Sequence, residues 1–171
     1  MSTYEKIRDG LFSKMRTKPQ NDSEIHLRWV REAIKLVTDR LSDLLGSRDI
    51  LLGRTPDPFR ALDLDWPLDN QWRPDRDGRL DFYIGVRFAD TSGIPDDPTI
   101  PRNFMVWLHG VVIVDHTLLS SGVGPYFHLA DSSQREFRAE AFAEVMQSRL
   151  IRWVNNLPIS WRPGNDIIIL R

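Results

Sequence analysis

Apolar residues recur at helical spacing in two segments near the start of the chain. The first segment, residues 3–16, has an apolar residue at every third or fourth position, which predicts a short amphipathic helix. The second, residues 22–45, has a wider apolar face, and Gly46 follows it where a helix commonly ends. A face this wide is typical of a helix that packs on a sheet. Its apolar positions are Trp29, Val30, Ala33, Ile34, Leu36, Val37, Leu41, Leu44 and Leu45.

The centre of the chain has the two-residue period of β-strands instead. From Leu80 to Phe88 every second residue is apolar, which predicts a strand with one buried face. Phe104–Val114 is apolar at almost every position, as is typical of a central strand covered on both faces. A short strand at 50–52 and a final strand at 166–170 bring the predicted sheet to about four strands.

Helical spacing returns over residues 134–155, which predicts a third helix. Ser133 and Glu136 have the spacing of a capping box at its start. The resulting element order is α-α-β-β-α-β. We therefore expect one α+β domain over residues 1–171, with three helices packed mainly on one face of an antiparallel or mixed sheet. The N-terminal helix, within residues 1–18, is the part that we expect at the periphery.

Composition agrees with this order and narrows the class of protein. All six Glu and all four Lys lie outside residues 36–135, where Asp, Arg and Pro dominate; Glu and Lys favour helices, whereas Asp and Pro favour turns. The chain has no cysteine, which excludes disulfides and thiol nucleophiles. The start of the chain has no apolar signal-peptide core, and no apolar run is long enough to span a bilayer. We expect a cytoplasmic protein, and the 19 Arg against 4 Lys favour a bacterial source.

Known catalytic motifs are absent from the sequence. There is no phosphate-binding glycine loop followed by lysine, no G-x-S-x-G and no H-E-x-x-H. Gly122-Val123-Gly124 lacks the third glycine of a dinucleotide-binding loop, and we interpret it as a turn. Six aspartates lie between residues 63 and 81 and could hold Ca²⁺ or Mg²⁺. Three arginines lie among them and can neutralise them instead, so we expect a self-paired loop and neither a metal nor a cofactor.

The four histidines do not have the spacing of a zinc site. His109 lies in a strand that is otherwise apolar, so it needs a polar partner or a cavity. His116 follows Asp115 at the end of the same strand, and His128 precedes the third helix. Two strand-end histidines and an aspartate could make a metal site or an acid–base pair. Because no third ligand is evident, we interpret His109 as a hydrogen-bonded structural residue.

One face of the predicted sheet is a candidate ligand site. If the two long strands are neighbours, Tyr83 and Arg87 adjoin Trp107 and His109, and this aromatic and basic set suits an anionic or planar ligand. The competing interpretation is that a helix or a subunit covers this face and that Arg87 pairs with an aspartate. An open pocket here would favour the alternative function, a small-molecule- or nucleotide-binding enzyme.

The leading hypothesis is a non-enzymatic protein-binding module, such as an adaptor, an immunity-like protein or a regulatory subunit. Tryptophan and arginine are enriched at binding hot spots, and the chain places both types in polar, Pro-rich segments. The candidate partner-binding residues are Trp66, Trp72, Arg73, Trp161 and Arg162. Residues 61–116 contain ten Asp and five Arg, a net charge of −5, which favours a basic partner and disfavours nucleic acid. Alternatively, the tryptophans anchor long loops to the core.

The last predicted strand points to assembly. Residues 167–170 are all apolar, and no charge or proline in them protects an edge. We therefore expect this strand either inside the sheet or paired across a two-fold axis in a homodimer.

Overall fold

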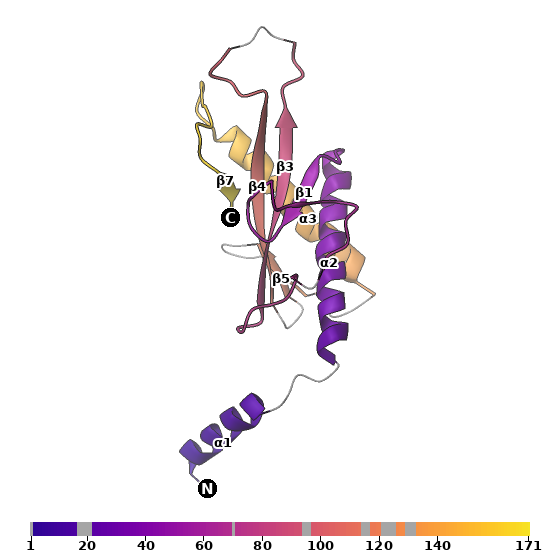
Figure 1. Cartoon of the computed structure of the whole chain (residues 1–171), viewed down its shortest axis with the longest axis vertical. Coiled ribbons are helices and arrows are strands. Elements are labelled where there is room, and N and C mark those ends of the chain that lie inside the picture. The colour runs from indigo at the N-terminus through magenta and orange to yellow at the C-terminus, as the bar shows by residue number, and fades with distance from the viewer. Residues whose placement is uncertain are drawn as a thin grey trace.

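The computed structural model describes residues 2–16, 22–69, 71–93, 97–113, 117–120, 126–128 and 133–171. Three helices and seven strands are present in this part of the chain (Figure 1). They are α1 (Thr3–Arg16), α2 (Asp22–Leu45), β1 (Ile50–Gly53), β2 (Leu62–Asp63), β3 (Arg79–Ala89), β4 (Asn103–Ile113), β5 (Thr117–Ser120), β6 (Tyr126–His128), α3 (Arg135–Asn155) and β7 (Ile168–Leu170). The α+β class predicted from the sequence is confirmed.

The strands form one mixed sheet in the order β2-β1-β3-β4-β5-β6, in which all neighbours are antiparallel. β7 returns to the middle of this sheet and pairs with β4 in parallel. The second edge of β4 is therefore shared by β7, opposite residues 106–108, and by β5, opposite residues 110–113. The sheet has more strands than expected because β2, β5 and β6 are too short to show a period of two.

Helices α2 and α3 cover one face of the sheet and bury the apolar core (Figure 1). Even-numbered residues of β3 and β4 point into this core, as their alternation predicted. A side chain of this kind contributes about 1.5–3 kcal/mol when fully buried. The core residues from these four elements are Val30, Ala33, Ile34, Val37, Leu41, Leu80, Phe82, Ile84, Val86, Val106, Leu108, Val112, Ala139, Phe142, Ala143, Met146 and Leu150.

Two glycines fit the long strands together. Gly110 pairs with Phe82, and a Cβ at Gly110 would lie 2.3 Å from the Phe82 ring. Gly85 pairs with Trp107, and a Cβ at Gly85 would lie 2.7 Å from the Trp107 ring. Each glycine thus makes room for an aromatic ring of the opposite strand, one on each face of the sheet.

Local sequence accounts for an end of α1 and of α2, but not for the start of α3. Ser2 and Glu5 form a capping box at α1, in which the Glu5 amide donates to the Ser2 hydroxyl at 3.2 Å. Gly46 ends α2 at a φ of 64°. The capping box expected at α3 is absent, because the helix starts at Arg135, with Gln134 as its N-cap and no side-chain capping bond. Glu136 is thus one position too early in the helix for that motif.

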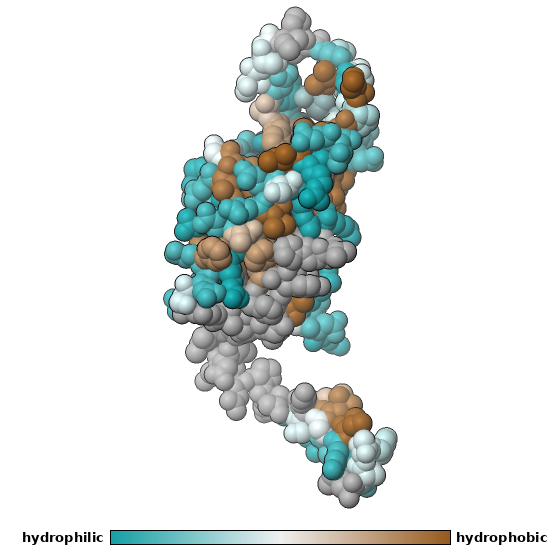
Figure 2. Space-filling model, turned by 180° about the vertical axis from the view of Figure 1, so that it is seen from behind, coloured by the Kyte–Doolittle hydropathy of each residue, from teal (hydrophilic) through white to brown (hydrophobic). Residues whose placement is uncertain are grey.

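Helix α1 has the predicted bounds, but its apolar face is uncovered. Tyr4 is 72% exposed and Met15 is 67% exposed. Figure 2 shows this apolar surface on the helix at the lower end of the molecule. No helix in the described ranges is long and apolar enough to cross a membrane.

Candidate functional site

The sheet face that points away from α2 and α3 carries all four residues predicted to bind a ligand. The strand register pairs Tyr83 with His109, and the two rings stack with their centroids 4.7 Å apart. Trp107 and Arg87 lie on the same face. Arg87, however, forms an ion pair with Asp49 at 3.3 Å. The structure therefore brings the aromatic residues together and engages the arginine elsewhere.

His109 has a carboxylate partner on β3. Its Nε2 lies 2.7 Å from Oδ1 of Asp81, which also accepts a hydrogen bond from Arg79 at 2.8 Å. The bond from Arg79 is the main cause that lowers the pKa of Asp81, and burial opposes it. Burial is the main cause that lowers the pKa of His109, although Asp81 opposes the shift. A neutral His109 donates from Nε2, which leaves its buried Nδ1 without a partner among the described residues.

The central rings of this face are covered. Trp107 is 2% exposed and His109 is 4% exposed, although neither points toward the helices. The exposed area of either ring is therefore too small for a ligand to stack on it. Arg79, Asp81 and His109 therefore form a short hydrogen-bonded chain on this face of the sheet, and Tyr83 stacks on its His109 end.

Trp66 and Trp72, which lie among the aspartates of residues 63–81, have different environments. Trp72 is 3% exposed and belongs to the core; its carbonyl accepts a hydrogen bond from Arg31, and the Arg54 guanidinium lies 6.0 Å from its ring. Trp72 thus anchors the loop. Trp66 is 60% exposed, and Arg73 is also exposed.

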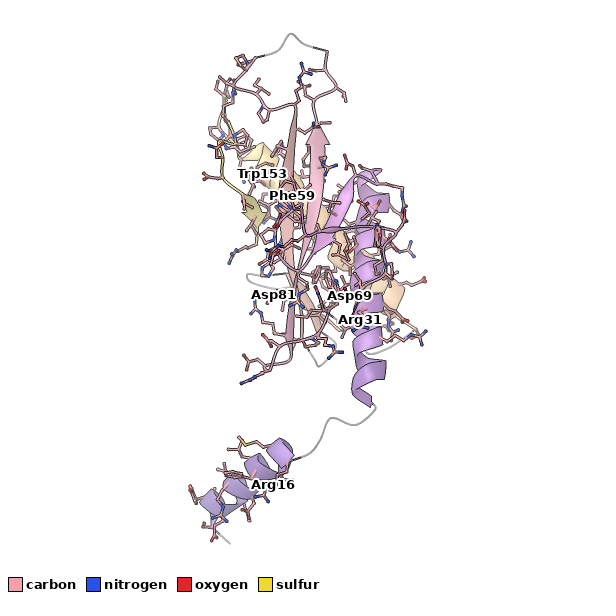
Figure 3. All side chains as sticks on the ribbon, viewed as in Figure 1. Arg16, Arg31, Phe59, Asp69, Asp81 and Trp153 are labelled. Atoms are coloured by element: carbon pink, nitrogen blue, oxygen red, sulfur yellow. The ribbon has the colours of Figure 1, made fainter. Side chains whose placement is uncertain are left out.

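Phe59 is another exposed aromatic residue between β1 and β3, and the sequence analysis missed it. Its side chain is 97% exposed, on a segment that crosses in front of the sheet in the view of Figure 3. Its neighbours, Pro58 and Arg60, are common loop residues. Nothing in the local sequence therefore distinguishes an exposed aromatic residue here from one that anchors the loop to the core.

Trp161 and Arg162 line a cavity of about 350 Å³. It lies between the 161–163 segment and the end of the β3–β4 hairpin. Aromatic and aliphatic side chains form its walls, and both acidic and basic groups lie among them. The apolar part of the walls includes Phe88, Ile100, Phe104 and Trp161, and the charged residues in the lining are Asp90, Arg102 and Arg162.

The walls of this cavity are held by ring contacts and by an ion pair. The Phe104 ring lies 5.8 Å from Phe88 and 5.9 Å from Trp161, and Trp161 meets Trp153 of α3 edge-on at 5.4 Å. Arg162 reaches the hairpin tip, where it lies 3.5 Å from Asp97. Phe88 is nevertheless 39% exposed and Ile100 is 45% exposed. Contacts between its walls therefore hold the cavity, and its apolar wall remains accessible.

Phe88, Phe104 and Ile100 were not among the predicted site residues. The alternation of β3 includes Phe88, and by itself it marks Phe88 as a core residue. Phe88 lies outside the core because β1 pairs with β3 only as far as Val86. No local sequence pattern shows where this pairing ends. Beyond this point the β3–β4 hairpin extends past β1 (Figure 1), and Figure 2 shows apolar side chains at that end of the molecule.

The other candidate chemistry does not form a site in the described structure. No group of three or more His, Asp or Glu that could hold a metal is found in the described ranges. The aspartates of the acidic segment make turns and ion pairs, as when Asp75 accepts from the amides of Asp77 and Arg79. His116, Asp115 and the glycines at 122 and 124 lie outside the described residues, as do the side chains of His26 and His128.

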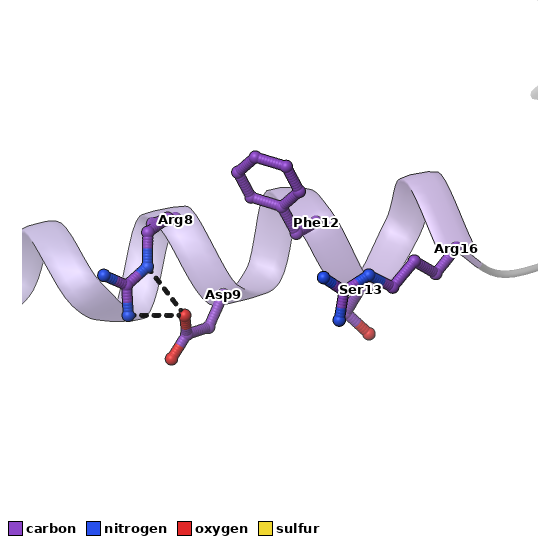
Figure 4. Close-up of a pocket in the computed structure, with 5 residues that line it drawn as sticks. All are labelled: Arg8, Asp9, Phe12, Ser13 and Arg16. Atoms are coloured by element: carbon purple, nitrogen blue, oxygen red, sulfur yellow. Dashed lines mark hydrogen bonds and ion pairs between the residues drawn. The ribbon is translucent and has the colours of Figure 1, made fainter.

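A depression on α1 is also not a binding site by itself. Figure 4 shows the residues that line it, all from one helix, with Arg8 paired to Asp9 at 2.9 Å. Because a single helix surface encloses nothing, the depression cannot hold a ligand.

Comparison with known proteins finds no match to a family model, to a curated protein or to a solved structure. The function must therefore be argued from the geometry of the molecule itself. Among the candidates, the cavity at the hairpin end combines an accessible apolar wall with charged residues beside it.

Proposed function

We propose that this protein is a protein-binding module and that a partner inserts an apolar side chain into the cavity beside Trp161. The observation that carries the proposal is the exposure of Phe88 and Ile100 in an aromatic cavity whose walls are joined by ring contacts and an ion pair. Pockets that accept aromatic or aliphatic anchors supply most of the affinity of many protein interfaces. Burial of Trp107 and His109 disfavours the alternative, an enzyme site on the sheet face.

The surroundings of the cavity define what the partner should offer. Asp90, Arg102 and Arg162 lie among the apolar walls, so polar groups that flank the apolar anchor can be hydrogen-bonded. The expected basic partner fits a different surface, near Trp66, where Asp65 is exposed and pairs with the exposed Arg48. We propose the cavity as the primary contact and the surface around Trp66 as a secondary one that steers association. The homodimer and the cytoplasmic location stay predictions.

The proposal can be tested with random 12-residue peptides displayed on phage. Selection on the full chain should enrich peptides with one aromatic or large aliphatic anchor. Ile100→Glu places a charge in the cavity wall without touching the core, and should weaken the selected peptides at least about tenfold, because a charge would be buried on binding. Ile151→Glu is the control, since Ile151 is 55% exposed on α3 and lies outside the cavity.

Melting temperatures of both variants should match that of the wild type. The proposal is wrong if selected peptides bind Ile100→Glu as tightly as the wild type, or if no peptide is enriched above a selection on an unrelated protein.

A further inference from the structure

Helix α1 presents five large apolar side chains to solvent. Each of them is between 48% and 72% exposed. Four recur at every third or fourth position and therefore lie in one stripe along the helix, and the fifth lies beside this stripe. In Figure 4, Phe12 points away from the side on which Asp9 and Ser13 lie. These five residues, which form the α1 face, are Tyr4, Ile7, Leu11, Phe12 and Met15.

A helix of this length gains little stability on its own. It has 14 residues, and isolated helices of that length are only marginally stable in water. Gly10 weakens it further, and nothing lies within 4 Å of the position that a Cβ would take there. The capping box at Ser2 and the ion pair between Arg8 and Asp9 hold only its N-terminal part. A surface that covers the α1 face would supply the missing stability.

The charges of α1 favour an anionic surface. Residues 3–16 contain four basic and two acidic residues, a net charge of +2, whereas the whole chain has −1 and its other residues therefore sum to −3. Both acids, Glu5 and Asp9, are already bonded within the helix. Lys6 and Arg16 have no ion pair with any residue in the described ranges. An anionic surface would thus attract the helix and repel the rest of the chain.

The sequence of α1 does not suit pairing with a second copy of itself. If Tyr4, Ile7 and Leu11 occupy the a, d and a positions of a heptad repeat, the next d position falls on Lys14. The helix also spans only two heptads, whereas coiled coils usually need three or four. Nor does α1 cover its apolar face with its own sheet, from which it lies apart in Figure 1. A surface other than this chain is therefore the best match.

We propose that α1 binds the surface of a membrane that contains anionic lipids. The α1 face enters the boundary between headgroups and acyl chains, and Lys6 and Arg16 contact the lipid phosphates. Amphipathic helices with basic polar residues lie in this plane without crossing the bilayer, and each cation near an anionic leaflet strengthens binding. Tyrosine favours the headgroup level, which agrees with Tyr4 in the first turn of the helix. The sheet, α2 and α3 remain in water.

Sedimentation of the full chain with lipid vesicles tests this surface. Vesicles of equal parts phosphatidylcholine and phosphatidylglycerol should bind the chain, more weakly as salt is added, and vesicles of phosphatidylcholine alone should bind it less. Leu11→Glu should lower the partition coefficient at least about tenfold, because a charge would have to enter the apolar layer. Its melting temperature should not change, since Leu11 is 51% exposed. Lys6→Gln combined with Arg16→Gln should weaken binding to the anionic vesicles only.

Ile151→Glu is the matched control, because Ile151 is 55% exposed on α3, outside the α1 face. The proposal is overturned if anionic vesicles do not bind the wild type, or if Leu11→Glu weakens binding no more than Ile151→Glu does. A wild type that is dimeric without lipid, beside a monomeric Leu11→Glu, would show that the α1 face pairs with a second copy and would also overturn it. Ile100→Glu should leave vesicle binding unchanged, so failure here is distinguishable from failure of the proposed peptide site.

Discussion

Replacing Trp66 and Trp72 one at a time should have very different effects on stability. Trp72 is 3% exposed and packs within the core, so Trp72→Ala removes a large buried side chain and leaves a cavity. Such a change costs about 3–5 kcal/mol. For a chain of this size it lowers the melting temperature by roughly 6–20 °C. Trp66 is 60% exposed, and Trp66→Ala should change the free energy of unfolding by no more than about 0.5 kcal/mol.

Urea unfolding followed by circular dichroism measures both free energies on one scale, and a thermal scan gives an independent ranking. Unchanged m-values would show that the denatured state is the same in both variants. The reasoning is refuted if Trp66→Ala destabilises the protein as much as Trp72→Ala, or if Trp72→Ala costs less than about 1 kcal/mol.

Two further changes probe the sheet. The pKa of His109 lies below its usual 6.5 in the folded protein because of burial, so the unfolded chain takes up the proton first and stability should fall as the pH drops below about 6.5. Urea unfolding between pH 8 and pH 5 should show this fall in the wild type and a flatter profile in His109→Gln; parallel profiles would contradict the assignment. Deletion of residues 167–171 should cost at least about 2 kcal/mol, and an unchanged melting temperature would refute the role of β7.

Long elements with a strict period were predictable from the sequence. β3 and β4 differ from the predicted ranges by one residue at each end, because eleven alternating or continuously apolar positions leave little choice. β2, β5 and β6 have two to four residues. The neighbouring strands determine their pairing, and no local sequence pattern predicts it.

Among the site residues, too, some features follow from local sequence and others depend on contacts between distant parts of the chain. That His109 needs a polar partner follows from its apolar strand, but the choice of Asp81 depends on the register of two strands. The aromatic cavity depends on a segment that returns from residue 161 to the hairpin tip and contacts Asp97 through Arg162. Contacts across this distance in the chain have no sequence signal unless related sequences are compared.

The fit of Gly110 to Phe82 and of Gly85 to Trp107 has a consequence for how this sequence can change over evolutionary time. A slip of the hairpin by two residues would keep every side chain on its own face, so hydrophobic patterning alone does not forbid it. It would, however, place each ring against a strand position that carries a Cβ. The glycine and the ring of each pair must therefore be inherited together. Among relatives, we expect positions 82 and 110 to covary, and positions 85 and 107 likewise, while the two pairs vary independently of each other.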